Sequence, residues 1–345
     1  MREEKISVSR DKTMLNKAVI VDGIPGCGKT LVSSIISSFK KVELYKFCYE
    51  LEYYCLLNFF NQMDLNTSSK MIRLKFDQLI YDVMMGREVN FRFNDQSSVF
   101  QTANRFRYFK RIFQEGDQSI PNKIIQDKPI LNIATHLMSG FNEPILRALK
   151  EKVIFLTMHR DPLFMIEQNI FNVSELYGTN RDFQLYFERN KEHLPFYTLG
   201  WEDKFLSSPP KERAIFFLEW ARKQFIKNKN INKSFKNYYE FTFESFVLNP
   251  FKHMNKMKDL IGTSFSNSTN SICKREKVPR KIISDGRNIE IYRRIGWKKM
   301  DTDDLNKEYE ILKNRAYSEI SSEAKKSLDW LIEDYKFLKK ELNED

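Results

Sequence analysis

The chain has 345 residues, of which 41% are hydrophobic and 14% aromatic, so a sizeable core is expected and a disordered chain is excluded. Lys and Arg number 57 against 46 Asp and Glu, and the net charge of +11 favours anionic ligands, although no basic run is dense enough to indicate nucleic acid. No apolar run could span a membrane, no signal peptide is visible in residues 1–17, and the four cysteines lack zinc-site or disulfide spacing, so we expect a cytoplasmic protein with no bound metal.

A strand, a glycine loop and a helix are predicted near the N-terminus. Residues 18–21 are a continuous apolar run, typical of a strand buried on both faces. Residues 23–30 fit the pattern G-x-x-x-x-G-K-[ST], and apolar residues at helical spacing follow from Leu31 to Phe39. This order of elements is the context in which the pattern forms a phosphate-binding loop, or P-loop. A chance match in an ordinary glycine turn is the alternative.

The residue types of this loop suit an anion. Glycines 23, 26 and 28 permit backbone dihedrals that a Cβ would forbid, so successive N–H groups can turn inward. The helix that begins near Lys29 directs its free N–H groups and its positive dipole end to the same point. Lys29 adds a full charge and Thr30 a hydroxyl. A phosphate or a similar tetrahedral anion is therefore expected here. Cys27 lies at the same helix N-terminus, which lowers a thiol pKa, but no chemistry is assigned to it.

The rest of the chain alternates between helical and strand patterns. Residues 43–47 are a possible second strand, and residues 49–115 predict aromatic-rich helices without clear strand signals. Later buried strands are predicted at 129–134, 152–158 and 239–243, and helices follow each of them. Residues 174–210 and 263–290 are expected to be irregular, and an amphipathic helix closes the chain.

These elements predict an α/β fold of three layers, α/β/α, with a mostly parallel sheet and a helical insertion. We expect residues 1–17 to be a flexible lead-in, residues 18–300 to form the P-loop domain, and residues 49–115 to be its helical insertion. Residues 301–345 are expected to be a helical segment packed on the same domain. In such a sheet the ligand binds at the carboxyl ends of the strands.

Two further strand ends join the glycine loop in one pattern. The strand at 129–134 ends in Thr135-His136-Leu137, and the strand at 152–158 leads to Arg160-Asp161-Pro162. Further on stand Thr242-Phe243-Glu244 with Asn249-Pro250, and then Tyr292 to Lys298. In this order the motifs resemble those of the P-loop sulfotransferase family, whose members use 3′-phosphoadenosine-5′-phosphosulfate (PAPS). The resemblance covers about residues 18–47 and 128–300 and omits the helical insertion.

The resemblance implies a role for each matching residue. His136 would be the general base that takes the proton from an acceptor hydroxyl, and Lys29 would be catalytic as well as binding. Arg160 would bind the 3′-phosphate of the nucleotide, with Gln168, Arg293 and Arg294 also on the cofactor. The loop residues that would bind the 5′-phosphosulfate are Gly23, Pro25, Gly26, Cys27, Gly28, Lys29, Thr30 and Leu31. The acceptor would be a hydroxyl of a carbohydrate or another small molecule.

Several positions depart from the family pattern. The basic residue of the family's loop is Gly26 here, and Lys29 stands at the position of its first threonine. Ala134 replaces a lysine, and Gln168 replaces a serine. An intact G-K-T is also typical of P-loop kinases that use ATP and Mg²⁺, so such a kinase is the first alternative. A non-catalytic nucleotide-binding protein is the second.

Overall fold

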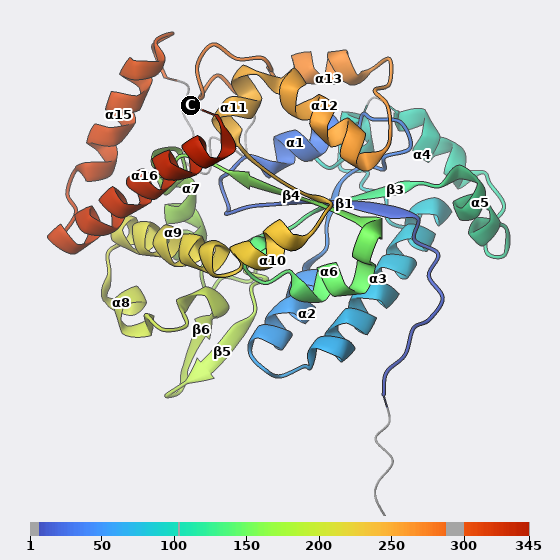
Figure 1. Cartoon of the computed structure of the whole chain (residues 1–345), viewed down its shortest axis with the longest axis horizontal. Coiled ribbons are helices and arrows are strands. Elements are labelled where there is room, and N and C mark those ends of the chain that lie inside the picture. Colours follow the sequence, from blue (N-terminus) through green and yellow to red (C-terminus); the bar gives the residue numbers. More distant parts are fainter. Residues whose placement is uncertain (1–6, 103, 288–299, 345) are drawn as a thin grey trace, which may run out of the picture.

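The computed structural model describes residues 7–102, 104–287 and 300–344. Its centre is a five-stranded sheet in the order β2-β3-β1-β4-β7, and all four strand pairings are parallel. The predicted α/β fold with a parallel sheet is therefore confirmed (Figure 1). In sheet order the strands are β2 (Lys46–Phe47), β3 (Ile130–Ala134), β1 (Lys17–Asp22), β4 (Val153–His159) and β7 (Tyr238–Thr242).

The strand β1 lies in the middle of the sheet, between β3 and β4. Val21 pairs with Ala134 on one side, and Asp22 pairs with Thr157 on the other. All seven residues of β4 and all five of β3 are buried, because helices cover both faces of the sheet. The carboxyl ends of these three neighbouring strands consequently meet at one edge.

Figure 1 shows the helices in two layers around the sheet. One layer holds α1 (Lys29–Ile36), α11 (Phe243–Leu248), α12 (Pro250–Ile261) and α13 (Thr269–Arg275). The other holds α2 (Tyr49–Phe59), α3 (Leu65–Met85), α6 (Glu143–Leu149), α9 (Pro210–Lys227) and α10 (Lys229–Ser234). The remaining α-helices are α4 (Arg105–Ile112), α5 (Ser119–Asp127), α7 (Ile166–Ile170), α8 (Glu202–Ser207), α15 (Leu305–Tyr317) and α16 (Ser322–Leu342). None of the described helices is long and apolar enough to cross a membrane.

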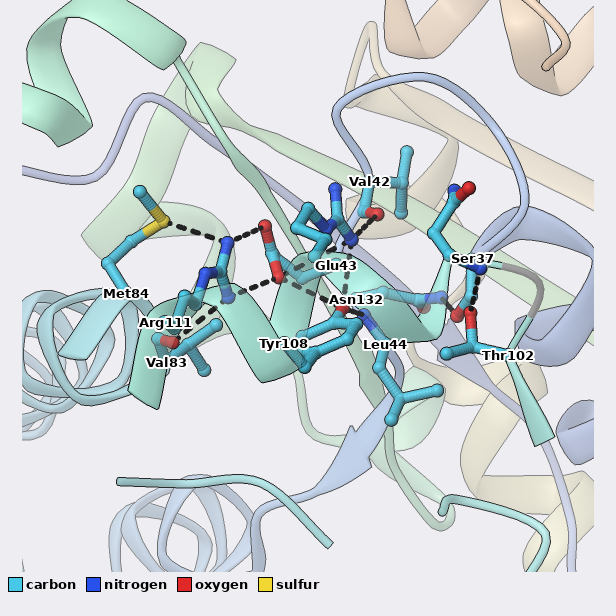
Figure 2. A network of polar contacts seen from close by, with 12 residues as sticks. Ser37, Val42, Glu43, Leu44, Val83, Met84, Thr102, Tyr108, Arg111 and Asn132 are labelled. Atoms are coloured by element: carbon cyan, nitrogen blue, oxygen red, sulfur yellow. Dashed lines mark hydrogen bonds and ion pairs between the residues drawn. The ribbon is translucent and has the colours of Figure 1, made fainter. Parts of the chain in front are cut away.

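The helices at 49–115 are tied to the sheet edge by a buried charge network (Figure 2). The Glu43 carboxylate accepts hydrogen bonds from both Nη atoms of Arg111, each at 2.9 Å, and from the Tyr108 hydroxyl at 3.0 Å. The Tyr108 hydroxyl also accepts from the Leu44 amide at 2.6 Å. Although burial opposes its charge, Arg107 and Arg111 hold the pKa of Glu43 below its ordinary value. This network fixes α4 beside β2.

Two segments differ from the sequence predictions. The expected irregular stretch at 174–210 contains an antiparallel hairpin, β5 (Tyr186–Arg189) with β6 (Glu192–Pro195), besides α8. The expected loop at 263–290 contains α13, in which Ile272 and Cys273 are buried against the core. Neither segment has a clear periodic pattern, and packing against the rest of the chain decides its structure.

Candidate active site

The loop at Gly23–Thr30 joins the end of β1 to the start of α1. Gly28 is the residue before the helix and has φ +93°, a left-handed conformation that favours glycine. A Cβ at Gly28 would also lie 2.4 Å from the ring of Phe243. The sharp turn and the close approach of Phe243 both require glycine here, and together they direct the first free amides of α1 toward the loop.

Lys29 is a buried cation with little compensation. Lys29 is only 5% exposed, and its Nζ donates one long hydrogen bond of 3.4 Å to the Gly23 carbonyl. Within the described residues no carboxylate lies within ion-pair distance of this ammonium group. Buried charges are normally paired, so the surroundings of Lys29 suit an anionic ligand.

His136 lies directly beside the start of this loop. The residue before it, Thr135, donates to the Asp22 carboxylate at 2.8 Å, and the amide of Leu137 donates to the Gly23 carbonyl at 3.3 Å. The imidazole stacks with two rings, with centroid distances of 5.3 Å to Phe47 and 5.9 Å to Tyr49. The side chain is 20% exposed and therefore accessible from outside.

Glu52 of α2 holds His136 from the buried side. Its Oε1 lies 3.0 Å from both the backbone nitrogen and Nδ1 of His136. Burial lowers the pKa of the His136 imidazole well below its ordinary value, and the nearby Lys29 ammonium lowers it further. Burial also raises the pKa of the Glu52 carboxyl, and Asp22 raises it further. At neutral pH the imidazole is therefore unprotonated at one nitrogen, as a base must be.

Asp22 joins β1 to the segment after β3. Its two carboxylate oxygens accept from Thr135 Oγ1, from the amides of Met138 and Ser139, and from Ser139 Oγ, at 2.6–3.0 Å. All of these donors come from the 3₁₀ turn η2 (Met138–Gly140) or the residues before it. Asp22 is fully buried and occupied by these bonds, so it acts as the structural link that fixes His136 beside the loop.

Arg160 approaches the loop from the other neighbouring strand. Its Nη1 donates to the Gly26 carbonyl at 2.8 Å, and its guanidinium lies 4.3 Å from the ring centroid of Phe243. Its Nε is buried and has no hydrogen-bond partner among the described residues. Gln168 of α7 lies against the same glycine, because a Cβ at Gly26 would come within 3.5 Å of its side chain. Asn169 donates to the Pro25 carbonyl at 2.9 Å.

The structure thus brings Lys29, His136, Arg160 and Gln168 to one edge of the sheet. Arg293 and Arg294 lie outside the described residues. Burial raises the pKa of the Cys27 thiol, although Lys29 acts in the opposite direction, so the lowered thiol pKa expected at the helix N-terminus is not found. The place of Cys27 among the cofactor-binding residues stays a prediction.

Two residues of the site were missed from the sequence. They are Glu52, on His136, and Asn169, which fixes the loop. Glu52 carried a signal, because it shares the buried face of α2 with Cys55 and Leu56. A carboxylate on an apolar helix face needs a polar partner.

A cavity lies behind the loop, between α9 and α16. Its volume is small, about 30 Å³, and Arg160, Arg222, Asp334 and Tyr335 are among its lining residues. Lys29 and His136 do not line it. The cavity therefore does not coincide with the place where a base and an acceptor would meet.

The chain is similar to solved structures, but not in sequence to a known family. No protein-family model and no curated protein matches the sequence. Among solved structures, the sulfotransferase domain of the Synechococcus PCC 7002 olefin synthase is similar with a TM-score of 0.45 and 10% identity, over 96% of this chain and 98% of that one. The sulfotransferase domain from the curacin biosynthetic pathway gives 0.44 and 10%, over 92% and 98%. Retinol dehydratase, in complex with androsterone and inactive cofactor PAP, gives 0.35 and 14%, over 93% and 80%. Because these identities and TM-scores are low, a substrate and a mechanism can be argued only from the residues of this chain.

Proposed function

We propose that this chain is a sulfotransferase that moves a sulfuryl group from PAPS to a hydroxyl of a carbohydrate or another small molecule. The observation that carries the proposal is that an imidazole and a guanidinium flank one anion-binding loop from opposite sides. His136 comes from the strand on one side of β1, and Arg160 comes from the strand on the other. A base, a cation and a cradle of amides are the groups that such a transfer requires.

The residues present fit an adenosine bisphosphate ligand. Lys29 is a buried ammonium without an ion-pair partner in the described part of the chain, and Arg160 Nε is a buried donor without an acceptor there. Lys29, Thr30 and the loop amides would hold the 5′-phosphosulfate. Arg160 and Gln168 would hold the 3′-phosphate, for which a planar guanidinium is well suited. The bound donor supplies an activated sulfuryl group.

The protein's own contribution is to place and deprotonate the acceptor. His136 accepts the proton from the acceptor hydroxyl as the oxygen forms its bond to sulfur. The bond between sulfur and the leaving phosphate oxygen breaks, and that oxygen keeps the electron pair. Lys29 and the loop amides stabilise the charge that develops on the leaving group, while the rings of Phe47 and Tyr49 hold the imidazole in place.

An ATP-dependent kinase is the second candidate, because the loop contains an intact Gly28-Lys29-Thr30. Two observations weigh against it. The residues that follow strand β3 are Thr135 and His136, not a carboxylate that could hold Mg²⁺. Asp22, the carboxylate nearest the loop on β1, already accepts four hydrogen bonds.

One binding experiment separates the candidates. Thermal unfolding is measured with 3′,5′-adenosine bisphosphate in EDTA and, separately, with ATP and Mg²⁺. A ligand at one hundred times its Kd stabilises the fold by about 2.7 kcal/mol, and with an unfolding entropy of about 0.7 kcal/mol/K for 345 residues this is roughly 4 °C. We expect the bisphosphate to give this shift without metal. A preference for ATP with Mg²⁺ would support the kinase, and no response to either ligand would support a non-catalytic role.

A further inference from the structure

The geometry of the contact between His136 and Glu52 indicates which ring nitrogen of His136 carries the proton. Two nitrogens of His136, the backbone amide and ring Nδ1, both lie 3.0 Å from one oxygen, Glu52 Oε1. The backbone nitrogen can only donate. An ionised carboxylate oxygen has two lone pairs, so the same atom can accept a second donor from the ring.

The surroundings keep this arrangement in place. Glu52 is only 4% exposed and comes from α2, which α3 and α6 cover. The imidazole lies nearly parallel to Phe47 and to Tyr49, with interplanar angles of 12° and 9°. Tilting the ring would break both stacks, and a half-turn, which keeps the ring plane, would break the contact between Nδ1 and Glu52. Within the described residues Nε2 has no hydrogen-bond partner, which leaves it as the nitrogen available to a substrate.

We propose that Glu52 is a positioning residue that keeps the proton of neutral His136 on Nδ1, so that Nε2 carries the lone pair that acts as the base. This inference rests on the proposed function, in which His136 deprotonates the acceptor. It makes the helical insertion part of the reaction machinery, since Glu52 belongs to it.

In the transfer step, one proton moves from the acceptor hydroxyl to His136. The O–H bond of the acceptor breaks, its proton binds Nε2, and the oxygen's electron pair forms the new bond to sulfur. His136 becomes an imidazolium with protons on both nitrogens, and Nδ1–H continues to donate to Glu52. The carboxylate charge faces the imidazolium at the moment when that cation forms, and this stabilises it.

Protonation of Glu52 would reverse the tautomer. A neutral carboxyl would keep its proton and donate a hydrogen bond to a bare Nδ1, the single ring proton would then be on Nε2, and Nε2 would no longer carry the lone pair that acts as the base. The titratable groups that act on Glu52 are Asp22 of β1, Lys29 of α1, His136, and Tyr49, Tyr53 and Cys55 of α2 itself. Burial and then Asp22 raise the pKa of Glu52 well above its ordinary value, whereas Lys29 and the backbone amide of His136 act in the opposite direction. The tautomer of His136 therefore also reports whether the Glu52 carboxylate is ionised.

The tautomer can be measured directly in the full-length protein by ¹⁵N NMR of the imidazoles. The chain has only four histidines, so His136→Asn assigns the relevant signals. Protonated and unprotonated ring nitrogens resonate far apart, and each is identified by its coupling to the ring carbons and protons. Spectra are recorded between pH 6 and pH 8 for the native chain, Glu52→Gln and Glu52→Ala. Glu240→Gln is the matched control, because Glu240 lies 2.6 Å from Nε2 of His159 in another buried Glu–His pair.

We expect the native chain to show a protonated Nδ1 and a bare Nε2 at His136. Glu52→Gln should keep this tautomer, since an amide oxygen also accepts two donors, and Glu52→Ala should lose it. Glu240→Gln should change only the signals of His159. A protonated Nε2 in the native chain would overturn the proposal, and so would an unchanged His136 spectrum in Glu52→Ala. The native spectrum decides the matter even if Glu52→Ala fails to fold.

The readout needs neither donor nor acceptor, so it separates this proposal from the proposed function. The expected tautomer without any response to adenosine bisphosphate would leave the role of Glu52 standing and remove the sulfotransferase. In an active enzyme, Glu52→Gln should lower kcat and leave KM for the donor unchanged. A merely structural role would instead change stability and both constants together.

Discussion

Replacing Arg160 with methionine tests whether its guanidinium recognises one particular phosphate. Arg160 makes one hydrogen bond to the loop, through Nη1 to the Gly26 carbonyl, and its Nε is buried without a partner in the described residues. Methionine keeps much of the side-chain volume against Phe243 but offers no donor. If Arg160 binds the 3′-phosphate, the variant should lose affinity only for ligands that carry that group.

The size of the loss follows from the bonds that the arginine can make. A hydrogen bond to a charged group contributes about 1.5–3 kcal/mol, and this corresponds to a loss of roughly ten- to 150-fold in affinity. With an unfolding entropy of about 0.7 kcal/mol/K for this chain length, the stabilisation by saturating ligand should shrink by roughly 2–4 °C.

The assay is a ligand-by-mutant cycle. Thermal stabilisation of the native chain and of Arg160→Met is measured with adenosine 3′,5′-bisphosphate and with adenosine 5′-phosphate. We expect the variant to lose affinity for the first ligand and to bind the second as the native chain does. Arg222→Met is the control, because Arg222 lines the same cavity but is already bonded to Asp334. Equal losses for both ligands in Arg160→Met would refute the reasoning, since Arg160 would then support the loop and not the 3′-phosphate.

Three further predictions concern the base, the insertion and pH. His136→Asn should lower kcat by roughly 10²–10⁴ with bisphosphate binding unchanged, as measured by turnover and thermal shift; unchanged turnover would remove His136 from the mechanism. Arg111→Met should cost about 3 kcal/mol, or roughly 4 °C, because the buried Glu43 carboxylate loses its two-pronged partner and keeps only the Tyr108 hydroxyl and Arg107 at 3.5 Å; a second change, Glu43→Leu, should restore part of the loss, and no restoration would contradict the pairing. Burial and then Glu244 raise the pKa of Asp161 to about 7, so the native chain loses stability as pH rises from about 4 to about 7. Asp161→Asn should therefore gain in urea stability relative to the native chain between pH 5 and pH 8, and a constant difference would contradict the shifted pKa.

The strands and the loop were predictable because local signals dictate them. Three of the sheet strands are mostly apolar, which is typical of strands in a sheet covered by helices on both faces. Backbone geometry requires glycine in the loop. At Gly28, for example, a Cβ would lie 2.4 Å from the ring of Phe243. Parallel pairing then places the ends of β3 and β4 beside the loop, so the positions of His136 and Arg160 followed from topology alone.

The missed elements depend on contacts that are distant in sequence. The β5–β6 hairpin is half exposed and polar, and its turn at Asn190 and Lys191 uses two residues with positive φ in place of glycine. The helix α13 is held by Ser38, whose hydroxyl lies 3.1 Å from Thr269, 231 residues away. No pattern within either segment specifies these partners.

Glu52 differs from both groups. Its position on a buried helix face was visible in the sequence, but the residue that it contacts was not. The charge on the buried face of α2 predicts that some polar group must meet it, yet any strand end of the sheet could have supplied that group. Only the order β2-β3-β1, which puts α2 after the edge strand and next to the end of β3, selects His136. The helical insertion carries no resemblance to a known motif, and it nevertheless supplies the carboxylate that holds the candidate base. A search for the acceptor should therefore treat α2 as one wall of the site, and changes at Tyr49 and Phe47, which stack on the imidazole, should alter acceptor choice before they alter donor binding.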